Sequence, residues 1–484
     1  RFTRVIRSKK FDFSLKNSGY IKMKYISTRG DSRKLDFMEV LTSGTAKDGG
    51  LYMPERFPNF SEDEIRSFEN LSYEELAANL LFPYIEGFLS KNDFEEIVKN
   101  AYSSFSIPEI VRLNETRSLG FVLELFHGPT FAFKDVAMQL LAALLDKAAE
   151  RSDKKIVVLG ATSGDTGSAA IEACKNFKDI NIVILFPDQK ISAVQQRQMT
   201  TSNADNVFPL SVKGNFDDCQ NHVKKIFLEN NDENVRFVSI NSINWTRIMA
   251  QSVYFFYTKL KIKKDFIASI PSGNFGHAYA GWTAKNMGLS FKGINVATNK
   301  NDVLHRLFLK DIYQQKEATS SLAPSMDISV ASNFERLLFE VYKKDGSFLK
   351  NLFSSFPSKP IKLSNLPDDG WNRIKDFFQS STCSDEDIID TIVNNFNHED
   401  LLFDPHTATA LKGNKDLNYD LSEVVTFATA HPAKFPEAVN AKLDVLEENT
   451  PSKLKEIMTM DESFSVVENN YEDVVSFINS EVLN

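Results

Sequence analysis

The residue best suited to covalent chemistry is a lysine in apolar surroundings. The stretch HGPTFAFKD, residues 127–135, places Lys134 directly after a Gly-Pro turn and the pair Phe131 and Phe133. Partial burial beside these rings disfavours the ammonium form and lowers the pKa of the amine. A neutral lysine amine is the nucleophile that condenses with an aldehyde. Taken alone, the stretch also fits a lysine that reaches the surface from the start of a helix.

A short glycine-rich turn is the second candidate feature. In PSGNFGHAYAG, residues 271–281, Gly273 and Gly276 allow the backbone to approach a ligand closely, and a helix is predicted to follow. The free N–H groups at such a helix start bind a phosphate without any lysine or arginine. The pattern differs from those of nucleoside-triphosphate and dinucleotide sites, and an ordinary strand-to-helix turn is the alternative interpretation.

Two further loops carry hydroxyl groups. The loop ATSGDTGSAA carries the hydroxyls of Thr162, Ser163 and Thr166 and the carboxylate of Asp165 at the start of another predicted helix. It is a second place suited to an anion. In FATAHPAKF, Thr429 ends a strand-like run, and its hydroxyl can hydrogen-bond a ring nitrogen without protonating it. An amine for an aldehyde, a turn for a phosphate and a hydroxyl for a ring nitrogen together indicate pyridoxal 5'-phosphate.

The elements that position these loops alternate between strand and helix. Strands are predicted in GFVLELF, KKIVVLGAT, INIVILFP, DFIASIP and EVVTFATA, with helical segments between them. This alternation predicts right-handed βαβ crossovers and parallel sheets covered by helices on both faces. Ligands in such α/β folds bind at the carboxyl ends of the strands. Each of the four loops follows a predicted strand, so we expect them to meet at one site.

The predicted organisation has four parts. They are a basic extension at residues 1–22, a small N-terminal domain at 23–100, a catalytic core of two sub-domains at 101–440, and a C-terminal helical segment at 441–484. The extension is interpreted as sequence upstream of a start at Met23, with a transit peptide as the alternative. Within the core, residues 313–400 are expected to form a solvated surface insert.

Bulk composition excludes several classes of function. The 484 residues carry a formal net charge of -9, which argues against a broad nucleic-acid-binding surface. The three cysteines are scattered, so neither a disulfide scaffold nor a metal site is expected, and a cytoplasmic location fits. The longest apolar runs are shorter than the roughly 20 residues that span a bilayer, so no membrane partner is expected.

The set of motifs resembles a known enzyme family. The segments that carry the resemblance include YISTRGDS, GGLYMP, HGPTFAFKD, ATSGDTGSAA, QQRQMTT, SINSINWTRIMAQ, PSGNFGHAYAG, DPHTATA and ATAHPAKF. The collection is similar to the threonine synthase family, pyridoxal-phosphate enzymes of the tryptophan-synthase-β-like fold (fold type II), in the longer form with a separate N-terminal domain. The resemblance covers about residues 25–440.

The resemblance implies a role for each candidate residue. Lys134 would be the Schiff-base lysine and catalytic base, and Thr429 the partner of the ring nitrogen. The cofactor phosphate would be held by Gly273, Asn274, Phe275 and His277. The substrate would be bound by Ser163, Asp165, Thr166 and Arg247, although Arg247 also fits a helix surface. His406 is interpreted as a structural histidine, and Asp217 and Asp218 as acids at a helix start.

The implied reaction converts O-phospho-L-homoserine and water to L-threonine and phosphate, without a metal. Two alternatives stay open. The first is an enzyme of the same fold that acts on another phosphorylated amino acid as a lyase, without hydrating the intermediate. The second is a catalytically inactive paralogue. The intact stretch around Lys134 (residues 127–135, the lysine loop) argues against it. A monomer or a homodimer is expected.

Overall fold

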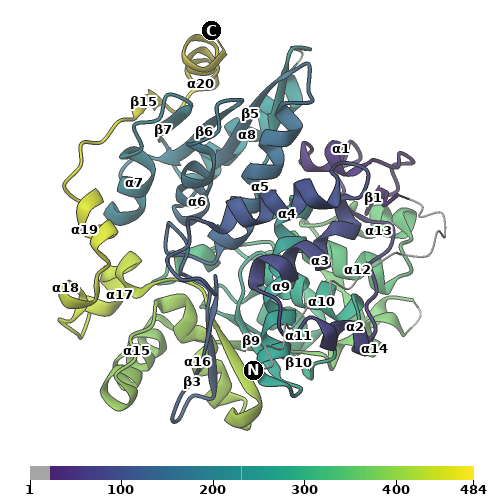
Figure 1. Cartoon of the computed structure of the whole chain (residues 1–484), viewed down its shortest axis with the longest axis vertical. Helices are drawn as coiled ribbons and strands as arrows, with labels where there is room; N and C mark the ends of the chain where they lie inside the picture. The colour runs from purple at the N-terminus through teal and green to yellow at the C-terminus, as the bar shows by residue number, and fades with distance from the viewer. Residues whose placement is uncertain (1–21, 231, 368, 484) are drawn as a thin grey trace, which may run out of the picture.

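The computed structural model describes residues 22–230, 232–367 and 369–483. Two sheets make up the centre of the molecule, one in the upper half of the view in Figure 1 and one in the lower half. All but one of their strand pairings are parallel, which confirms the predicted α/β class. Of the basic extension predicted at residues 1–22, everything before Lys22 lies outside the described residues.

The first sheet has six strands in the order β13-β10-β9-β14-β4-β3. Its strands are β3 (Arg112–Glu115), β4 (Phe121–Glu124), β9 (Ile267–Pro271), β10 (Gly293–Thr298), β13 (Phe378–Thr382) and β14 (Val424–Ala428). Only β3 runs antiparallel to its neighbour. The central strand β14 is buried along its whole length, because helices cover both faces of a parallel sheet.

The second sheet has five parallel strands in the order β15-β7-β6-β5-β8. Its strands are β5 (Lys155–Ala161), β6 (Ile180–Pro187), β7 (Val207–Lys213), β8 (Val235–Val238) and β15 (Ser465–Glu468). Alternate residues of β5 belong to different apolar clusters, Ile156 and Val158 to one and Val157 and Leu159 to the other. Both faces of the sheet are therefore covered, as the near-continuous apolar runs predict.

Helices surround both sheets. Those of the core are α5 (Lys134–Ala149), α6 (Asp165–Cys174), α7 (Ala193–Thr200), α8 (Phe216–Glu229), α9 (Trp245–Ile262), α10 (Gly276–Asn286), α11 (Val303–Lys310) and α16 (Pro405–Asp416). Helix α5 runs across the middle of the molecule and packs against α9 (Figure 1). At the start of α8, Asp218 closes a capping box with Asn215, which confirms the interpretation of this acid as a helix-start residue.

The N-terminal region packs directly on this core. It consists of β1 (Tyr25–Ser27), α1 (Phe37–Leu41), β2 (Tyr52–Pro54), α2 (Glu62–Ser67), α3 (Tyr73–Ile85) and α4 (Lys91–Tyr102). Ser61 and Ser72 form capping boxes at the starts of α2 and α3, as their sequence signals predict. Tyr84 of α3 contacts Trp245 of α9 with the ring centroids 5.6 Å apart. The region therefore shares one apolar cluster with the core.

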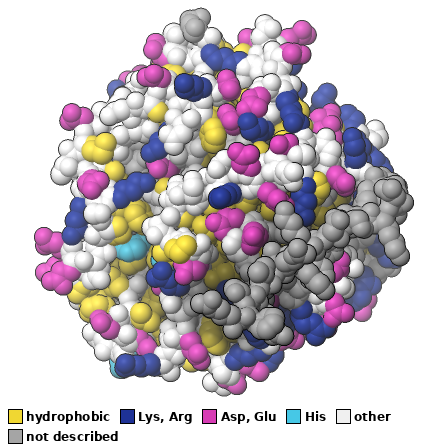
Figure 2. Space-filling view, viewed as in Figure 1, with side chains coloured by type: hydrophobic (Ala, Val, Ile, Leu, Met, Phe, Trp, Pro, Cys, Tyr) yellow, Lys and Arg dark blue, Asp and Glu magenta, His cyan; other side chains and the backbone are white. Residues whose placement is uncertain are grey.

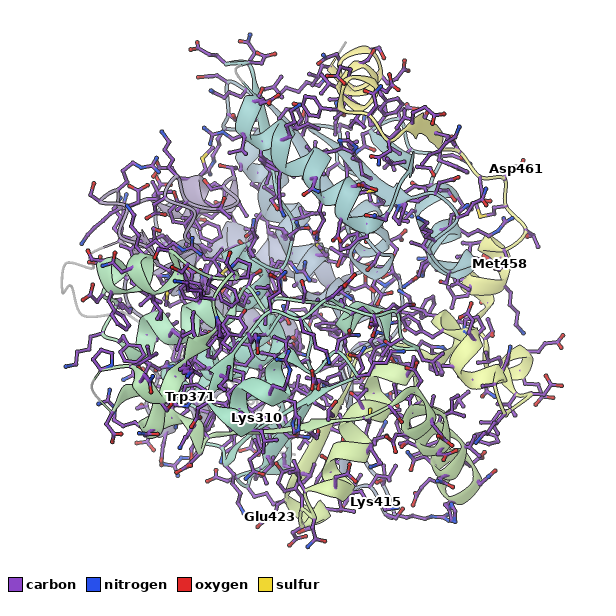
Figure 3. All side chains as sticks on the ribbon, turned by 180° about the vertical axis from the view of Figure 1, so that it is seen from behind. Lys310, Trp371, Lys415, Glu423, Met458 and Asp461 are labelled. Carbon is purple, nitrogen blue, oxygen red and sulfur yellow. The ribbon has the colours of Figure 1, made fainter. Side chains whose placement is uncertain are left out.

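The C-terminal segment contains a strand that the helical prediction missed. Helix α17 (Pro436–Asn440) precedes this segment, whose own helices are α18 (Leu446–Asn449), α19 (Ser452–Ile457) and α20 (Tyr471–Phe477), followed by a π-helical turn (Ile478–Leu483). Between α19 and α20, β15 pairs with β7 at the edge of the second sheet. Figure 3 labels Met458 and Asp461 on the stretch that leads to this strand. The prediction of a purely helical segment is wrong here because a four-residue edge strand has almost no sequence signal.

The surface-insert prediction for residues 313–400 is wrong in two places. The elements there are β11 (Ile312–Tyr313), α12 (Phe334–Val341), α13 (Gly346–Phe353), β12 (Ile361–Lys362), α14 (Gly370–Lys375) and α15 (Asp385–Glu399). Helix α12 is almost wholly buried, and β13 is an edge strand of the first sheet. On the face of the molecule shown in Figure 2, basic and acidic side chains are interspersed.

Candidate active site

The lysine loop lies against the end of strand β14. Phe133 donates a backbone hydrogen bond to the carbonyl of Thr429, at 2.8 Å, and Ala132 and Ala430 form an isolated antiparallel bridge. The loop follows β4, which is the neighbour of β14 in the sheet. The structure therefore brings together Lys134 and Thr429, two residues predicted for one site but almost 300 positions apart.

A buried carboxylate fixes the turn before the lysine. Asp135 accepts hydrogen bonds from the backbone N–H and the hydroxyl of Thr130, at 2.8 and 2.6 Å. Burial raises the pKa of this carboxyl to about 6. A side chain at Gly128 would lie 2.4 Å from the Asp135 Cβ, so only glycine fits there. The Gly-Pro turn thus holds the first turn of α5 in place, with Lys134 as its first residue.

The Lys134 amine is enclosed. Its side chain is 10% exposed, and Nζ lies 3.2 Å from Asp165 Oδ2 and 3.3 Å from Ser325 Oγ. Burial lowers the pKa of the amine, and the charges of Lys434 and Arg247 act in the same direction, against the attraction of Asp165. The interpretation of Lys134 as a solvated surface lysine is therefore wrong. An amine with a lowered pKa in an enclosed site is suited to nucleophilic chemistry.

Asp165 is the centre of the polar contacts around this amine. Its Oδ1 accepts from Lys434 Nζ at 2.9 Å and from Gln195 Nε2 at 3.0 Å, and its Oδ2 accepts from Ser325 Oγ at 3.1 Å. Burial alone would raise the pKa of this carboxyl, but the charges of Lys134 and Lys434 hold it well below its usual value. Asp165 is therefore a carboxylate shared by two amines.

The glycine turn joins the end of β9 to α10 beside the same serine. A Cβ at Gly273 would lie 2.8 Å from the carbonyl oxygen of Ser325, so the close approach requires glycine. Phe275 takes a left-handed conformation, with φ of 61°, and its ring is buried against Phe308 and Phe334. Its side chain therefore belongs to the core, and only its backbone lines the turn.

Asn274 and His277 have different surroundings in this turn. The Asn274 side chain donates to the hydroxyl of Ser242 and accepts from the backbone N–H of Ser332, so its amide is already committed within the protein. His277 stacks on Phe133, with the ring centroids 5.0 Å apart, directly beside the lysine. The glycine turn and the lysine loop are thus in contact, as the sequence predicts.

Several buried polar atoms near the turn lack a hydrogen-bond partner among the described residues. They are the Ser272 hydroxyl, the Arg247 Nε and both ring nitrogens of His277. Burial lowers the pKa of the Arg247 guanidinium to about 10, and its Nη1 donates to the Ile240 carbonyl at 2.9 Å. Arg247 is therefore no surface arginine. Unpartnered buried donors mark a place where a polar ligand is expected.

The loop after β5 provides the remaining candidates. Thr162 accepts from the backbone N–H groups of Gly164 and Gly167, both at 2.9 Å, and this fixes the start of α6. Ser163 and Thr166 are half-buried, and neither hydroxyl has a partner within the described parts of the chain. Both hydroxyls are therefore available to a ligand beside Asp165.

Four residues that the sequence analysis did not select also form the site. Ser325 belongs to a 3-10 turn (Pro324–Met326), and its backbone N–H donates to His406 Nε2 at 3.2 Å, while His406 Nδ1 pairs with Asp404. Both ring nitrogens of His406 are hydrogen-bonded, as expected of a structural histidine, and one of them also holds the turn that carries Ser325 beside Lys134. The others are Gln195, Asp404 and Lys434. Lys434 could have been selected from the sequence, because it lies between the apolar residues Ala433 and Phe435. Nothing in the sequence around Ser325 indicates a role in the site.

The histidine in the turn gives a testable pH dependence. Burial lowers the pKa of His277 to about 3, whereas an unfolded chain titrates near 6.5. Between these values the unfolded state binds one more proton, so the free energy of unfolding falls as the pH is lowered, by up to about 1.4 kcal/mol per pH unit. In the cofactor-free protein we expect His277→Phe to remove this dependence. Urea unfolding of both proteins from about pH 4 to pH 7 measures this dependence. If the free energy of unfolding falls equally in both proteins as the pH is lowered, the prediction is contradicted.

This arrangement defines the class of the protein. A buried lysine amine, a glycine turn and a strand-end hydroxyl at the carboxyl edge of parallel strands are the parts of a pyridoxal-phosphate-dependent enzyme of fold type II. The family profile described as "Pyridoxal-phosphate dependent enzyme" matches residues 106–349. Two others, "Threonine synthase N terminus" and "Threonine synthase, C-terminal", match residues 24–102 and 407–478. The chain belongs to the threonine synthase family, and pyridoxal phosphate is its cofactor.

Known relatives match almost the whole chain. A threonine synthase from Pseudomonas aeruginosa is 42% identical over 461 residues, which cover 94% of this chain and 98% of the relative. A crystal structure of a pyridoxal-phosphate-bound threonine synthase from Brucella melitensis has a TM-score of 0.89 and 39% identity, and covers 95% of this chain and 99% of its own. The yeast threonine synthase structure also has a TM-score of 0.89, with 33% identity and coverage of 96% and 99%.

The described residues contain neither a membrane-spanning helix nor a cluster of metal ligands. Across the described ranges, no helix is both long and apolar enough to cross a bilayer. Within the same ranges, no group of three or more histidine, cysteine, aspartate or glutamate side chains is arranged to hold a metal ion.

Proposed function

We propose that the protein converts O-phospho-L-homoserine and water to L-threonine and phosphate. The observation that carries this proposal is the enclosed Lys134 amine, which shares Asp165 with a second lysine and lies beside the glycine turn. The threonine synthase relatives support the same product. The proposal also places the protein in the cytoplasm, which its three free, buried cysteines support, and expects a monomer or homodimer.

The residues present fit the cofactor. Lys134 would bind its aldehyde, and Thr429 would hydrogen-bond its ring nitrogen. The backbone of Gly273, Asn274 and Phe275 would hold its phosphate, and the unpartnered ring of His277 lies beside that turn. When bound, pyridoxal phosphate supplies an aldehyde that takes up the substrate amine and a ring that stores electrons released at Cα.

Lys134 is the residue that would carry out the proton transfers. With cofactor and substrate bound, the Lys134 amine would remove the proton from Cα and carry protons to and from Cβ. Phosphate would leave from Cγ, and Cγ would take up a proton to become the methyl group of threonine. A water would add at Cβ to give the hydroxyl, and Cα would regain its proton. Ser325 Oγ, 3.3 Å from Nζ, holds the amine on this side of the site. The lowered pKa of Lys134 increases the fraction of the amine that is neutral and able to act as a base.

Two groups would bind the anionic ends of the substrate. The half-buried hydroxyls of Ser163 and Thr166, at the start of α6, suit the carboxylate. The buried guanidinium of Arg247 suits the phosphate, because arginine binds phosphate in a bidentate manner. Asp165, which the sequence placed among the substrate-binding residues, is not expected to contact the substrate directly. Its oxygens are already bound by two amines, an amide and a hydroxyl.

Product analysis tests the reaction. We expect equal amounts of L-threonine and phosphate from O-phospho-L-homoserine, and little 2-oxobutyrate or ammonia. Formation of 2-oxobutyrate and ammonia without threonine would instead establish the lyase alternative. Purified protein without the visible absorbance of lysine-bound cofactor, and without turnover of this substrate, would establish the inactive paralogue.

A further inference from the structure

A second buried lysine in the site has no part in the reaction proposed above. Lys434 ends a 3-10 turn (Pro432–Lys434) that follows β14, and it is 0% exposed. Its Nζ lies 2.9 Å from Asp165 Oδ1 and donates to the carbonyl of Thr130 at 2.9 Å. Burying an ammonium group is strongly unfavourable unless it is paired, so this arrangement requires an explanation.

One carboxylate compensates the charge of one ammonium group, yet two lysines contact Asp165. Lys434 approaches Oδ1 at 2.9 Å, while Lys134 approaches Oδ2 at the longer distance of 3.2 Å. Two further charges act on these amines. The guanidinium of Arg247 on α9 adds a positive charge that acts on Lys134, and the carboxyl of Asp135 interacts with Lys434. Three cations therefore face two carboxylates. With both lysines charged, the cluster would hold an uncompensated buried cation. One of the two amines is therefore favoured in its neutral form.

The hydrogen bonds indicate which amine is neutral. Both contacts of Lys434, to a carboxylate and to a backbone carbonyl, are 2.9 Å, whereas those of Lys134 are 3.2 and 3.3 Å. Shorter hydrogen bonds are typical of a charged donor, so the distances favour the ammonium form at Lys434. Lys134 has two hydrogen-bond partners, Asp165 and the hydroxyl of Ser325. A neutral –NH₂ group keeps two N–H donors for these contacts and leaves its lone pair free to form a bond.

We propose that Lys434 is a positioning residue, a permanent counter-ion of Asp165 that leaves Lys134 as the neutral, nucleophilic amine. The titratable and charged groups around Lys134 are Asp165 of α6, Arg247 of α9, His277 of α10, His406 of α16, Asp135 of its own helix, and Lys434 itself. Of these, Lys434 is the one that contacts the same carboxylate. This inference rests on the proposed role of Lys134 as the reacting amine.

The test reads the lysine amine directly, without substrate. The cofactor-free full chain is treated with trace acetic anhydride over a range of pH, and mass spectrometry of the Lys134 peptide gives the midpoint at which that amine becomes reactive. In Lys434→Met, Asp165 has only Lys134 as its counter-ion, so we expect this midpoint to rise by about one pH unit or more. Lys434→Arg retains the charge and is expected to keep the midpoint near that of the unmodified chain.

A second pair of variants provides the same comparison if Lys434→Met does not fold. Asp165→Asn and the double variant Asp165→Asn, Lys434→Met differ only in the Lys434 charge, and the double variant leaves no unpaired carboxylate. We expect a higher Lys134 midpoint in the double variant, again by about one pH unit or more. Equal midpoints within the pairs that fold would overturn the proposal.

Lys453→Met is the matched control. Lys453 also donates to a carbonyl of the lysine loop, that of Pro129, at 2.9 Å, but its carboxylate partner is Glu172 rather than Asp165. If Lys434 only held the loop in place, Lys434→Met and Lys453→Met would shift the Lys134 midpoint to a similar extent. A comparable shift in Lys453→Met would therefore also overturn the proposal. Because no substrate is used, a failure of the proposed reaction leaves this result unaffected.

Discussion

In Lys134→Ala we expect turnover of O-phospho-L-homoserine to fall by about 10⁴-fold or more, with the fold intact. The change removes both the amine that binds the cofactor aldehyde and the base that moves protons at Cα and Cβ. Folding is retained because Asp165 keeps Lys434 as its counter-ion at 2.9 Å, so no uncompensated buried carboxylate remains. Steady-state kinetics measure the loss, and thermal unfolding checks the fold.

The same variant allows the attachment site to be mapped. Borohydride reduction of the unmodified enzyme followed by peptide mapping is expected to find the cofactor on the Lys134 peptide, and Lys134→Ala is expected to carry none. Lys147→Ala is the control on the same helix, since Lys147 pairs with Glu150 at the surface. Turnover within tenfold of the unmodified enzyme in Lys134→Ala would remove this lysine from the mechanism.

The second large effect is expected in Arg247→Met. The guanidinium is buried with an unpartnered Nε, and we propose that it binds the substrate phosphate. Removing one partner of a desolvated charge pair costs about 2–5 kcal/mol, so kcat/KM is expected to fall roughly 30- to 4,000-fold. The loss is expected mainly in KM, and steady-state kinetics with O-phospho-L-homoserine measure it.

Two comparisons separate phosphate binding from a general disturbance. Arg306→Met changes an arginine of α11 that pairs with Asp302 instead, and it is expected to leave KM unchanged. Binding of L-threonine, which has no phosphate, is expected to weaken far less than binding of the substrate in Arg247→Met. Equal weakening for both ligands would show that Arg247 supports the structure of the site and does not bind the phosphate.

Several elements of the core were predictable because they are buried, although the buried strands β7 and β10 were not predicted. The strand in INIVILFP corresponds to β6, and the helix after the lysine to α5, since long apolar or amphipathic runs have few other solutions. Strands β13 and β15 were missed for the opposite reason. Both lie at sheet edges, and β15 alternates half-buried with exposed residues over only four positions. Such strands are specified by the partner strand more than by their own sequence.

The loops of the site were predictable for a related reason. Lys134, the glycine turn and Thr429 each carry a local signal, and the rule that strand ends gather at one edge predicts that they meet. Ser325 carried no such signal, because a serine in an irregular segment is ordinary. Its importance comes only from its position, where it contacts Lys134 and Asp165 and approaches Gly273.

By itself the sequence determined which chemical groups this protein has and which strand ends present them, because turn residues and apolar periodicity act over short distances. The tertiary structure alone decided how charge is distributed among those groups. Asp165 and Lys434 are 269 positions apart in the chain, yet their side chains are 2.9 Å apart in the fold. The protonation of a buried amine depends on the charges within a few ångströms of it, and no local pattern in the sequence specifies those neighbours.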